Sequence, residues 1–127
     1  MNEKTKINNP VDAYDLLSRY ASERQDHFIV LTLDGAHQVN GQHIVTIGLA
    51  NRTLVHPREV FYPAIVDNAV AIIVAHNHPS GQILPSPEDE QITQRLHDAG
   101  EILGIPVLDH IIIGNGRYYS FAEAGSL

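Results

Sequence analysis

Two histidines and an aspartate in this sequence stand at a spacing that suits one divalent metal ion. His76 and His78 flank a single asparagine, and Asp89 follows in the next segment of the chain. Imidazole nitrogens and carboxylate oxygens both bind Zn²⁺, and three protein ligands leave a fourth position for water, as in catalytic zinc sites. Zinc lowers the pKa of such a water to about 7 and polarises a carbonyl. The spacing therefore suggests a zinc hydrolase.

A buried strand is expected to hold the two histidines. Residues 69–75, directly before His76, are apolar throughout and rich in β-branched side chains, as in a strand that is buried on both faces. Side chains two residues apart in an extended chain point the same way, so His76 and His78 should leave the strand end on one side. Residues 79–81, Pro-Ser-Gly, then turn the chain away.

A helix start is expected to bring the aspartate to the histidines. Ser86 suits the N-cap, Pro87 the first helical position and Asp89 the third. This geometry lets the Asp89 carboxylate face back toward the strand end. Capping and the helix dipole alone would also explain an acidic residue at this position. Asp89 therefore supports a metal site only in combination with the two histidines.

Four blocks of the sequence form a series in a fixed order. They are residues 55–61 (VHPREVF), 75–81 (AHNHPSG), 85–89 (PSPED) and 104–114 (GIPVLDHIIIG). Together they resemble the RadC family of the JAB/MPN (JAMM) superfamily, and the likeness extends from about Arg19 to Phe121. The resemblance implies an α/β fold of the cytidine-deaminase-like JAB/MPN type, with a mixed central β-sheet between helices in three layers.

The resemblance also implies roles for individual residues. The superfamily motif is an upstream Glu, then His-x-His, then Ser-x-x-Asp, and His76, His78, Ser86 and Asp89 match its last two parts. By this resemblance, His76, His78 and Asp89 bind zinc. Ser86 would help to hold the water or the tetrahedral intermediate, in addition to capping its helix.

The upstream Glu of the motif, the general base of the superfamily, is replaced in this chain. It stands at the start of the first long strand, and this sequence places Asp26 there. An Asp side chain is one methylene shorter, and a general base must come within about 2.6–3.2 Å of the group whose proton it takes. Asp26 is therefore the predicted catalytic base, with the nearby Glu23 as the alternative.

The length and composition predict one domain, residues 1–127, which buries about two-thirds of its unfolded surface. The chain has no cysteine, which excludes thiolate ligands and leaves His and carboxylates to bind zinc. We find neither the apolar core of a signal peptide nor an apolar run of membrane-spanning length, so a cytoplasmic location away from membranes is expected. Longer members of the family carry an N-terminal, helix-hairpin-helix-like region, which is expected to be absent from this chain.

The net charge bears on the historical association of the RadC family with DNA repair. The chain has a formal net charge of −7 at pH 7, with only eight Lys and Arg residues and no basic cluster. Nucleic-acid affinity depends mainly on cations that displace counterions from phosphates. Direct nucleic-acid binding is therefore not expected, and the predicted partner is a peptide or protein substrate.

Helices and strands are expected to alternate along the chain. Periodicity and Pro starts predict helices at residues 10–21, 57–68 and 87–103, and apolar runs predict strands at 28–33, 38–48, 69–75, 107–113 and 117–121. The first two strands should pair antiparallel, and Asn115-Gly116 predicts a hairpin before the last strand. The tail, residues 122–127, is expected to be loose. The residues expected to be buried on the second and third helices are Val60, Phe61, Ala64, Ile65, Ile92, Leu96, Ala99 and Leu103.

Several other polar side chains have lesser predicted roles. His110, beside Asp109 in an apolar strand, is expected to be a satisfied core histidine or to orient the site indirectly. His43 is the reserve candidate for a place near the metal. Asn77 should point away from the ligands and hydrogen-bond the neighbouring loop, and His56 is expected to cap or pack at a helix start.

Three functions follow as hypotheses. The first is a zinc-dependent hydrolase that cleaves an amide, such as a peptide or isopeptide bond, with Asp26 or Glu23 as base. The second is an MPN-type interaction module with little or no activity, for which the shortened base is the motivating feature. The third, a DNA-repair accessory protein that binds nucleic acid directly, is disfavoured by the negative charge.

Overall fold

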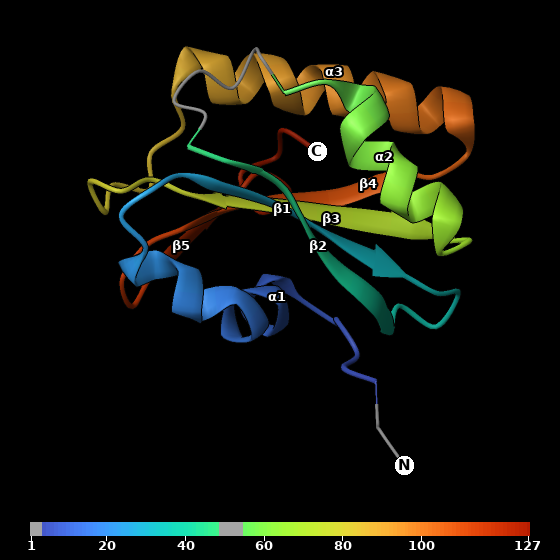
Figure 1. Ribbon diagram of the computed structural model, residues 1–127, viewed down its shortest axis with the longest axis horizontal. Coiled ribbons are helices and arrows are strands. Elements are labelled where there is room, and N and C mark those ends of the chain that lie inside the picture. Colours follow the sequence, from blue (N-terminus) through green and yellow to red (C-terminus); the bar gives the residue numbers. More distant parts are fainter. Residues whose placement is uncertain (1–3, 49–54) are drawn as a thin grey trace.

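The computed structural model describes residues 4–48 and 55–127, which form three layers (Figure 1). The described strands make one five-stranded sheet in the order β2-β1-β3-β4-β5. Strands β3 and β4 run parallel, and the other neighbouring pairs are antiparallel. The sheet is therefore mixed, as predicted. Its strands are β1 (His27–Leu33), β2 (Val39–Ile47), β3 (Ala71–Asn77), β4 (Val107–Ile113) and β5 (Tyr118–Ser120).

Helices cover both faces of the sheet. Figure 1 shows α1 (Pro10–Leu17) on one face and α2 (Pro57–Val66) and α3 (Pro87–Leu103) on the other. The prediction of one continuous helix over residues 10–21 was wrong, because α1 ends at Leu17 and a 3₁₀ helix, η1 (Ser18–Ser22), follows. This tighter segment brings Tyr20 into the core, where it is 6% exposed. Among the described residues, no helix is both long and apolar enough to cross a bilayer.

Alternation along the strands divides the interior into two cores. In β1, Ile29, Leu31 and Leu33 pack toward α1, whereas Phe28 and Val30 pack toward α2 and α3. In β3, Ile73 and Ala75 belong to the first core and Ile72 and Val74 to the second. Because side chains two residues apart share a face, His76 follows Ile72 and Val74 on the side of the sheet that faces α2 and α3. The prediction of a strand buried on both faces is confirmed, since every residue of β3 is buried.

Three predictions about burial and order were wrong. Ile65 is 60% exposed and Leu103 is 48% exposed. Val60, Phe61 and Ala64 already fill the contact face of α2, and Ile65 lies about 100° further around the helix. On α3, Leu96 and Gly100 are the last buried positions. The tail is not loose, because Ser126 N–H donates to the carbonyl of Phe121 at 2.8 Å and neighbouring turns are also hydrogen-bonded.

Candidate metal centre

The ends of two adjoining elements bring the predicted ligands together. His76 is the second-to-last residue of β3, and His78 directly follows the end of the strand. Asp89 occupies the third position of α3, behind Ser86 as N-cap and Pro87. One ligand atom from each of His76, His78 and Asp89 lies within 4.8 Å of the others. The sequence therefore predicted correctly which side chains meet at this edge of the sheet.

The three side chains are close enough to share one ion. His76 Nε2 lies 3.0 Å from His78 Nε2 and 3.1 Å from Asp89 Oδ1. His78 Nε2 lies 3.0 Å from Asp89 Oδ2. The His76 and Asp89 side chains are 0% and 1% exposed, whereas that of His78 is 18% exposed. The cluster thus lies at the protein surface on the His78 side only.

The hydrogen bonding of His78 places its ring proton on Nδ1 and leaves Nε2 as an acceptor. Its Nδ1 lies 2.9 Å from the backbone carbonyl of Gln82, and a carbonyl can only accept, so Nδ1 carries the proton. In the neutral imidazole, Nε2 then presents a lone pair toward His76 and Asp89. The loop after β3 therefore sets His78 in the form that binds metals.

Asp89 supplies the negative charge of the cluster. Burial raises the pKa of its carboxyl, and the hydrogen bond from the Ser86 N–H lowers it. The Ser86 N–H donates to Asp89 Oδ2 at 2.9 Å, and the Asp89 N–H donates to Ser86 Oγ at 3.1 Å. This capping box orients the carboxylate and favours its ionised form.

The donor set fits a divalent transition-metal ion. At bond lengths of about 2.0–2.1 Å, tetrahedral geometry separates neighbouring ligand atoms by about 3.3–3.4 Å. The observed separations of 3.0 and 3.1 Å are shorter by a few tenths of an ångström, so a small outward shift of the side chains would admit the ion. Two imidazoles and a carboxylate are, in addition, ligands that these metals prefer. His76, His78 and Asp89 could therefore bind a metal ion.

Asp26, the predicted base, lies directly before β1 at the same edge of the sheet. In the antiparallel register of β1 and β3, Phe28 pairs with His76. Asp26 precedes Phe28 by two residues, and His78 follows His76 by two. Asp26 is half-buried, and its carbonyl accepts the N–H of Gly48 at 2.7 Å. Glu23, the alternative, is exposed at the end of the 3₁₀ helix.

Asn77 hydrogen-bonds the segment that carries Asp26. Its Oδ1 accepts the N–H of His27 at 2.7 Å, and its Nδ2 donates to the carbonyl of Gln25 at 3.1 Å. A longer contact of 3.5 Å joins Nδ2 to the carbonyl of Glu23. Asn77 is fully buried. The sequence predicted a hydrogen bond from Asn77 to a loop, and the structure identifies that loop as the one before β1.

His110 and Thr93 form a second layer behind His76. His110 Nε2 lies 2.8 Å from His76 Nδ1, so this buried histidine directly contacts a predicted ligand. His110 Nδ1 lies 2.5 Å from Thr93 Oγ1. Thr93 was not among the predicted site residues, and the signal that could have indicated it is its place one helical turn after Asp89, on the same face of α3.

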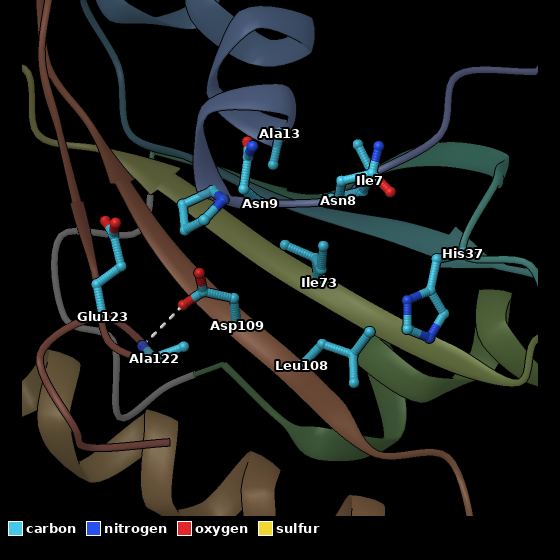
Figure 2. Close-up of a pocket in the computed structure, with 11 residues that line it drawn as sticks. Ile7, Asn8, Asn9, Ala13, His37, Ile73, Leu108, Asp109, Ala122 and Glu123 are labelled. Atoms are coloured by element: carbon cyan, nitrogen blue, oxygen red, sulfur yellow. Dashed lines mark hydrogen bonds between the residues drawn. The ribbon is translucent and has the colours of Figure 1, made fainter.

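Asp109 faces the opposite side of the sheet from His110. It lines a cavity of about 390 Å³ on the α1 face, together with Asn9, Ile73 and Glu123 (Figure 2). Its carboxylate accepts the N–H groups of His110 and Ala122, at 2.7 and 3.0 Å, and the Ser120 hydroxyl at 2.6 Å. Burial raises the pKa of Asp109, and these hydrogen bonds oppose that rise. Asp109 thus holds the backbone of His110 and contacts the centre only through it.

The other candidate histidines lie elsewhere. His43 Nε2 contacts Asp67 Oδ2 at 2.7 Å, so the reserve candidate is engaged in a separate ion pair. His56 is the N-cap residue of α2, but its side chain makes no capping hydrogen bond. Neither residue belongs to the metal-ligand group that the described part of the chain contains.

Comparison with known families agrees with the fold and the site. A mixed sheet with helices on both faces and a His-His-Asp group at one edge defines the chain as a JAB-domain protein. Residues 7–126 match the family described as a RadC-like JAB domain. The chain therefore belongs to the RadC family.

Curated relatives in this family are named UPF0758 proteins. One from Trichlorobacter lovleyi is 48% identical over 123 residues, which cover 96% of this chain and 54% of the relative. One from Pelobacter propionicus is 53% identical over 104 residues, covering 82% of this chain and 45% of the relative. One from Methanosarcina mazei is 44% identical over 123 residues, covering 96% and 54%. The chain spans about half the length of these relatives.

Proposed function

We propose that this domain is a zinc-dependent hydrolase that cleaves an amide, such as a peptide or isopeptide bond. The observation that carries the proposal is the convergence of two imidazole nitrogens and one carboxylate at 3.0–3.1 Å. Two His and one carboxylate are a ligand set of catalytic zinc sites in proteins. Zinc bound there would polarise a carbonyl and lower the pKa of a bound water to about 7.

Asp26 is the proposed general base. Its backbone lies at the same edge of the sheet as the ligands, and Asn77 hydrogen-bonds the residues on both sides of it. A carboxylate in this position would accept a proton from the attacking water. The shorter side chain makes the placement of this backbone segment decisive, since the base must come within about 2.6–3.2 Å of its partner. Glu23 is the alternative base, at the other end of the same segment.

Ser86 is proposed to assist at an oxygen that gains negative charge. Its Oγ accepts the Asp89 N–H at 3.1 Å, and its own hydroxyl proton remains available for donation. A preorganised donor of this kind stabilises a developing oxyanion. Ser86 would then serve both the helix and the reaction.

Metal content and turnover test the proposal together. Purified protein should contain about one zinc per chain and cleave members of a peptide library. Asp26→Asn should lower turnover by about 10²–10⁴-fold with zinc content unchanged, because only proton transfer is removed. Asp26→Glu should retain or increase turnover, and a loss of turnover in Glu23→Gln instead would identify Glu23 as the base. Protein without stoichiometric zinc would contradict the proposal, and equal turnover of Asp26→Asn and the unchanged protein would remove Asp26 as base.

A second candidate function is an interaction module with little or no activity. It is favoured by a groove of about 620 Å³ between β2 and α2, which is lined mainly by apolar atoms. Tyr62, Val66 and Ile44 on its walls are 69%, 64% and 47% exposed. Stoichiometric zinc combined with no effect of either Asp26 substitution would favour this function.

A peptide or protein is the proposed partner, in preference to nucleic acid. The formal net charge of −7 opposes binding to a phosphate backbone. We expect no DNA binding by this domain at 150 mM salt in a fluorescence-anisotropy titration. Binding that weakens steeply between 50 and 200 mM salt would instead support the nucleic-acid hypothesis.

A further inference from the structure

A buried chain of hydrogen bonds connects His76 to the backbone of Asp89 through two other side chains. His76 Nδ1 lies 2.8 Å from His110 Nε2, and His110 Nδ1 lies 2.5 Å from Thr93 Oγ1. The Thr93 hydroxyl donates to the carbonyl of Asp89 at 2.7 Å. His76 and His110 are fully buried and Thr93 is 4% exposed, so these groups have to satisfy one another.

The direction of each proton follows from the end of this chain. A carbonyl can only accept, so the Thr93 proton points to the Asp89 oxygen. The Thr93 oxygen then accepts from His110, which places a proton on His110 Nδ1. In a neutral His110, Nε2 is an acceptor, and the proton between the two rings belongs to His76 Nδ1. His76 Nε2 therefore presents a lone pair toward His78 and Asp89.

The surroundings of His110 favour its neutral form. Its ring stacks on Phe121 with centroids 4.7 Å apart and contacts the edge of Phe28 at 5.8 Å. Apolar aromatic neighbours around a fully buried ring disfavour a charge. The chain of hydrogen bonds then has one consistent set of protons from Thr93 to His76.

We propose that Thr93 and His110 are positioning residues that fix His76 as the Nδ1–H tautomer, with Nε2 directed at the metal. The inference rests on the metal-binding part of the proposed function. Thr93 lies one turn after Asp89 on α3, and its hydroxyl is held by the Asp89 carbonyl. The first two turns of α3 therefore supply one ligand and, through Thr93 and His110, also orient a second ligand on β3.

Thr93→Val tests this role, because it removes the hydroxyl and nearly preserves the volume. Thr93→Ser retains the hydroxyl and is the matched control. Thr32→Val is a second control, since Thr32 is also buried and bonds an aspartate, but at the Asp67 pair. Competition with a chromophoric chelator should show zinc affinity about 10–100-fold weaker for Thr93→Val. Both controls should stay within about threefold of the unchanged protein.

The tautomer is measured directly in the metal-free protein. Long-range ¹H–¹⁵N correlation spectra distinguish Nδ1–H from Nε2–H imidazoles, and His76→Ala assigns the signals. We expect the Nδ1–H pattern for His76 in the unchanged protein and in Thr93→Ser, and a mixture or the Nε2–H pattern in Thr93→Val. If Thr93→Val does not fold, His110→Phe, which keeps the stacking on Phe121 but removes both nitrogens, should show the same weakening of zinc affinity.

Two results would overturn the inference. One is an Nε2–H tautomer of His76 in the unchanged protein, and the other is a Thr93→Val or His110→Phe variant with unchanged zinc affinity. Failure of the proposed function appears differently. In that case the unchanged protein binds no zinc or cleaves no peptide, while the tautomer spectra of the metal-free protein still report on Thr93 and His110.

Discussion

Two clusters in this domain contain the same three residue types but differ in the direction of their protons. At one edge of the sheet, His76 and Asp89 lie in front of a buried threonine, Thr93. The second cluster lies near the start of β3, four residues from the first along the paired strands β1 and β3. There, His43 and Thr32 contact Asp67. In the second cluster, His43 Nε2 and Thr32 Oγ1 both lie 2.7 Å from Asp67 Oδ2 and donate to it. Among the described residues, the side chains of Thr32 and His43 supply the hydrogen bonds to this carboxylate.

At the metal centre, the proton on each Nδ1 points away from the carboxylate. His78 donates to the carbonyl of Gln82, and His76 faces His110. The centre is also more deeply buried, since the His76 and Asp89 side chains are 0% and 1% exposed, against 36% and 22% for His43 and Asp67. The comparison teaches that residue types at short distances do not make a metal site. In our proposal, the partners that take up the remaining protons distinguish the candidate metal site from the His43–Asp67 pair.

The largest expected effect separates the two clusters by zinc affinity. His76→Ala should weaken zinc binding by more than the roughly 100-fold expected for loss of an orienting residue, because it removes a ligand itself. His43→Ala should leave zinc affinity unchanged. Isothermal titration calorimetry with both variants measures the difference. An equal loss in the two variants would break the distinction between the centre and the ion pair.

The next effect concerns Asn77, which lies between the two candidate histidine ligands in the sequence and whose side-chain amide is buried. Asn77→Ala should lower the free energy of unfolding by about 1–3 kcal/mol, because the N–H of His27 loses its acceptor in the interior. Asn40→Ala is the matched control on β2, where the side chain is exposed and accepts from the exposed Lys4. The control should change stability by less than about 0.5 kcal/mol.

Urea unfolding of the two asparagine variants measures this contrast. Asn77→Ala should also lower peptide turnover more than zinc content, since it loosens the segment with Asp26 rather than the ligands. A stability equal to that of Asn40→Ala would show that the contacts of Asn77 contribute nothing beyond those of a surface residue.

The smallest effect is the pH dependence of the ion pair. Hydrogen bonds from Thr32 and His43 lower the pKa of Asp67 below its ordinary value of 3.8. A lowered folded-state pKa means that the carboxylate stabilises the fold above pH 3.8 and that this contribution is lost as the pH falls through the folded-state value. Its size should stay below about 1 kcal/mol, because the pair is partly exposed.

Urea unfolding between pH 7 and pH 2.5 tests this contribution. Asp67→Asn should be less stable than the unchanged protein at neutral pH, and the difference should shrink below pH 3.8. A difference that stays constant over the whole range would assign the effect to packing, and the comparison would then rest on the metal centre alone.

Local sequence was sufficient to predict the parts of the fold that depend on hydrophobic periodicity and on helix-capping and turn residues. The apolar run before His76 predicted β3, and Ser86-Pro87 predicted the start of α3 to the residue. The Asn115-Gly116 pair predicted the β4–β5 hairpin, where Gly116 has φ of 75°. Periodicity failed at Ile65 and Leu103, because the width of a buried helix face depends on the neighbour against which it packs.

The sequence by itself determined which side chains form the candidate ligand group, since His76 and His78 share a strand face by the period of two and Asp89 follows from the cap at Ser86. Only the tertiary structure decided how the protons are arranged. Thr93 and His110 belong to α3 and β4 and meet only because the helix packs across the sheet. Hydrogen-bond direction depends on which donors and acceptors come within 3 Å after folding, and sequence spacing does not encode that for residues on different elements.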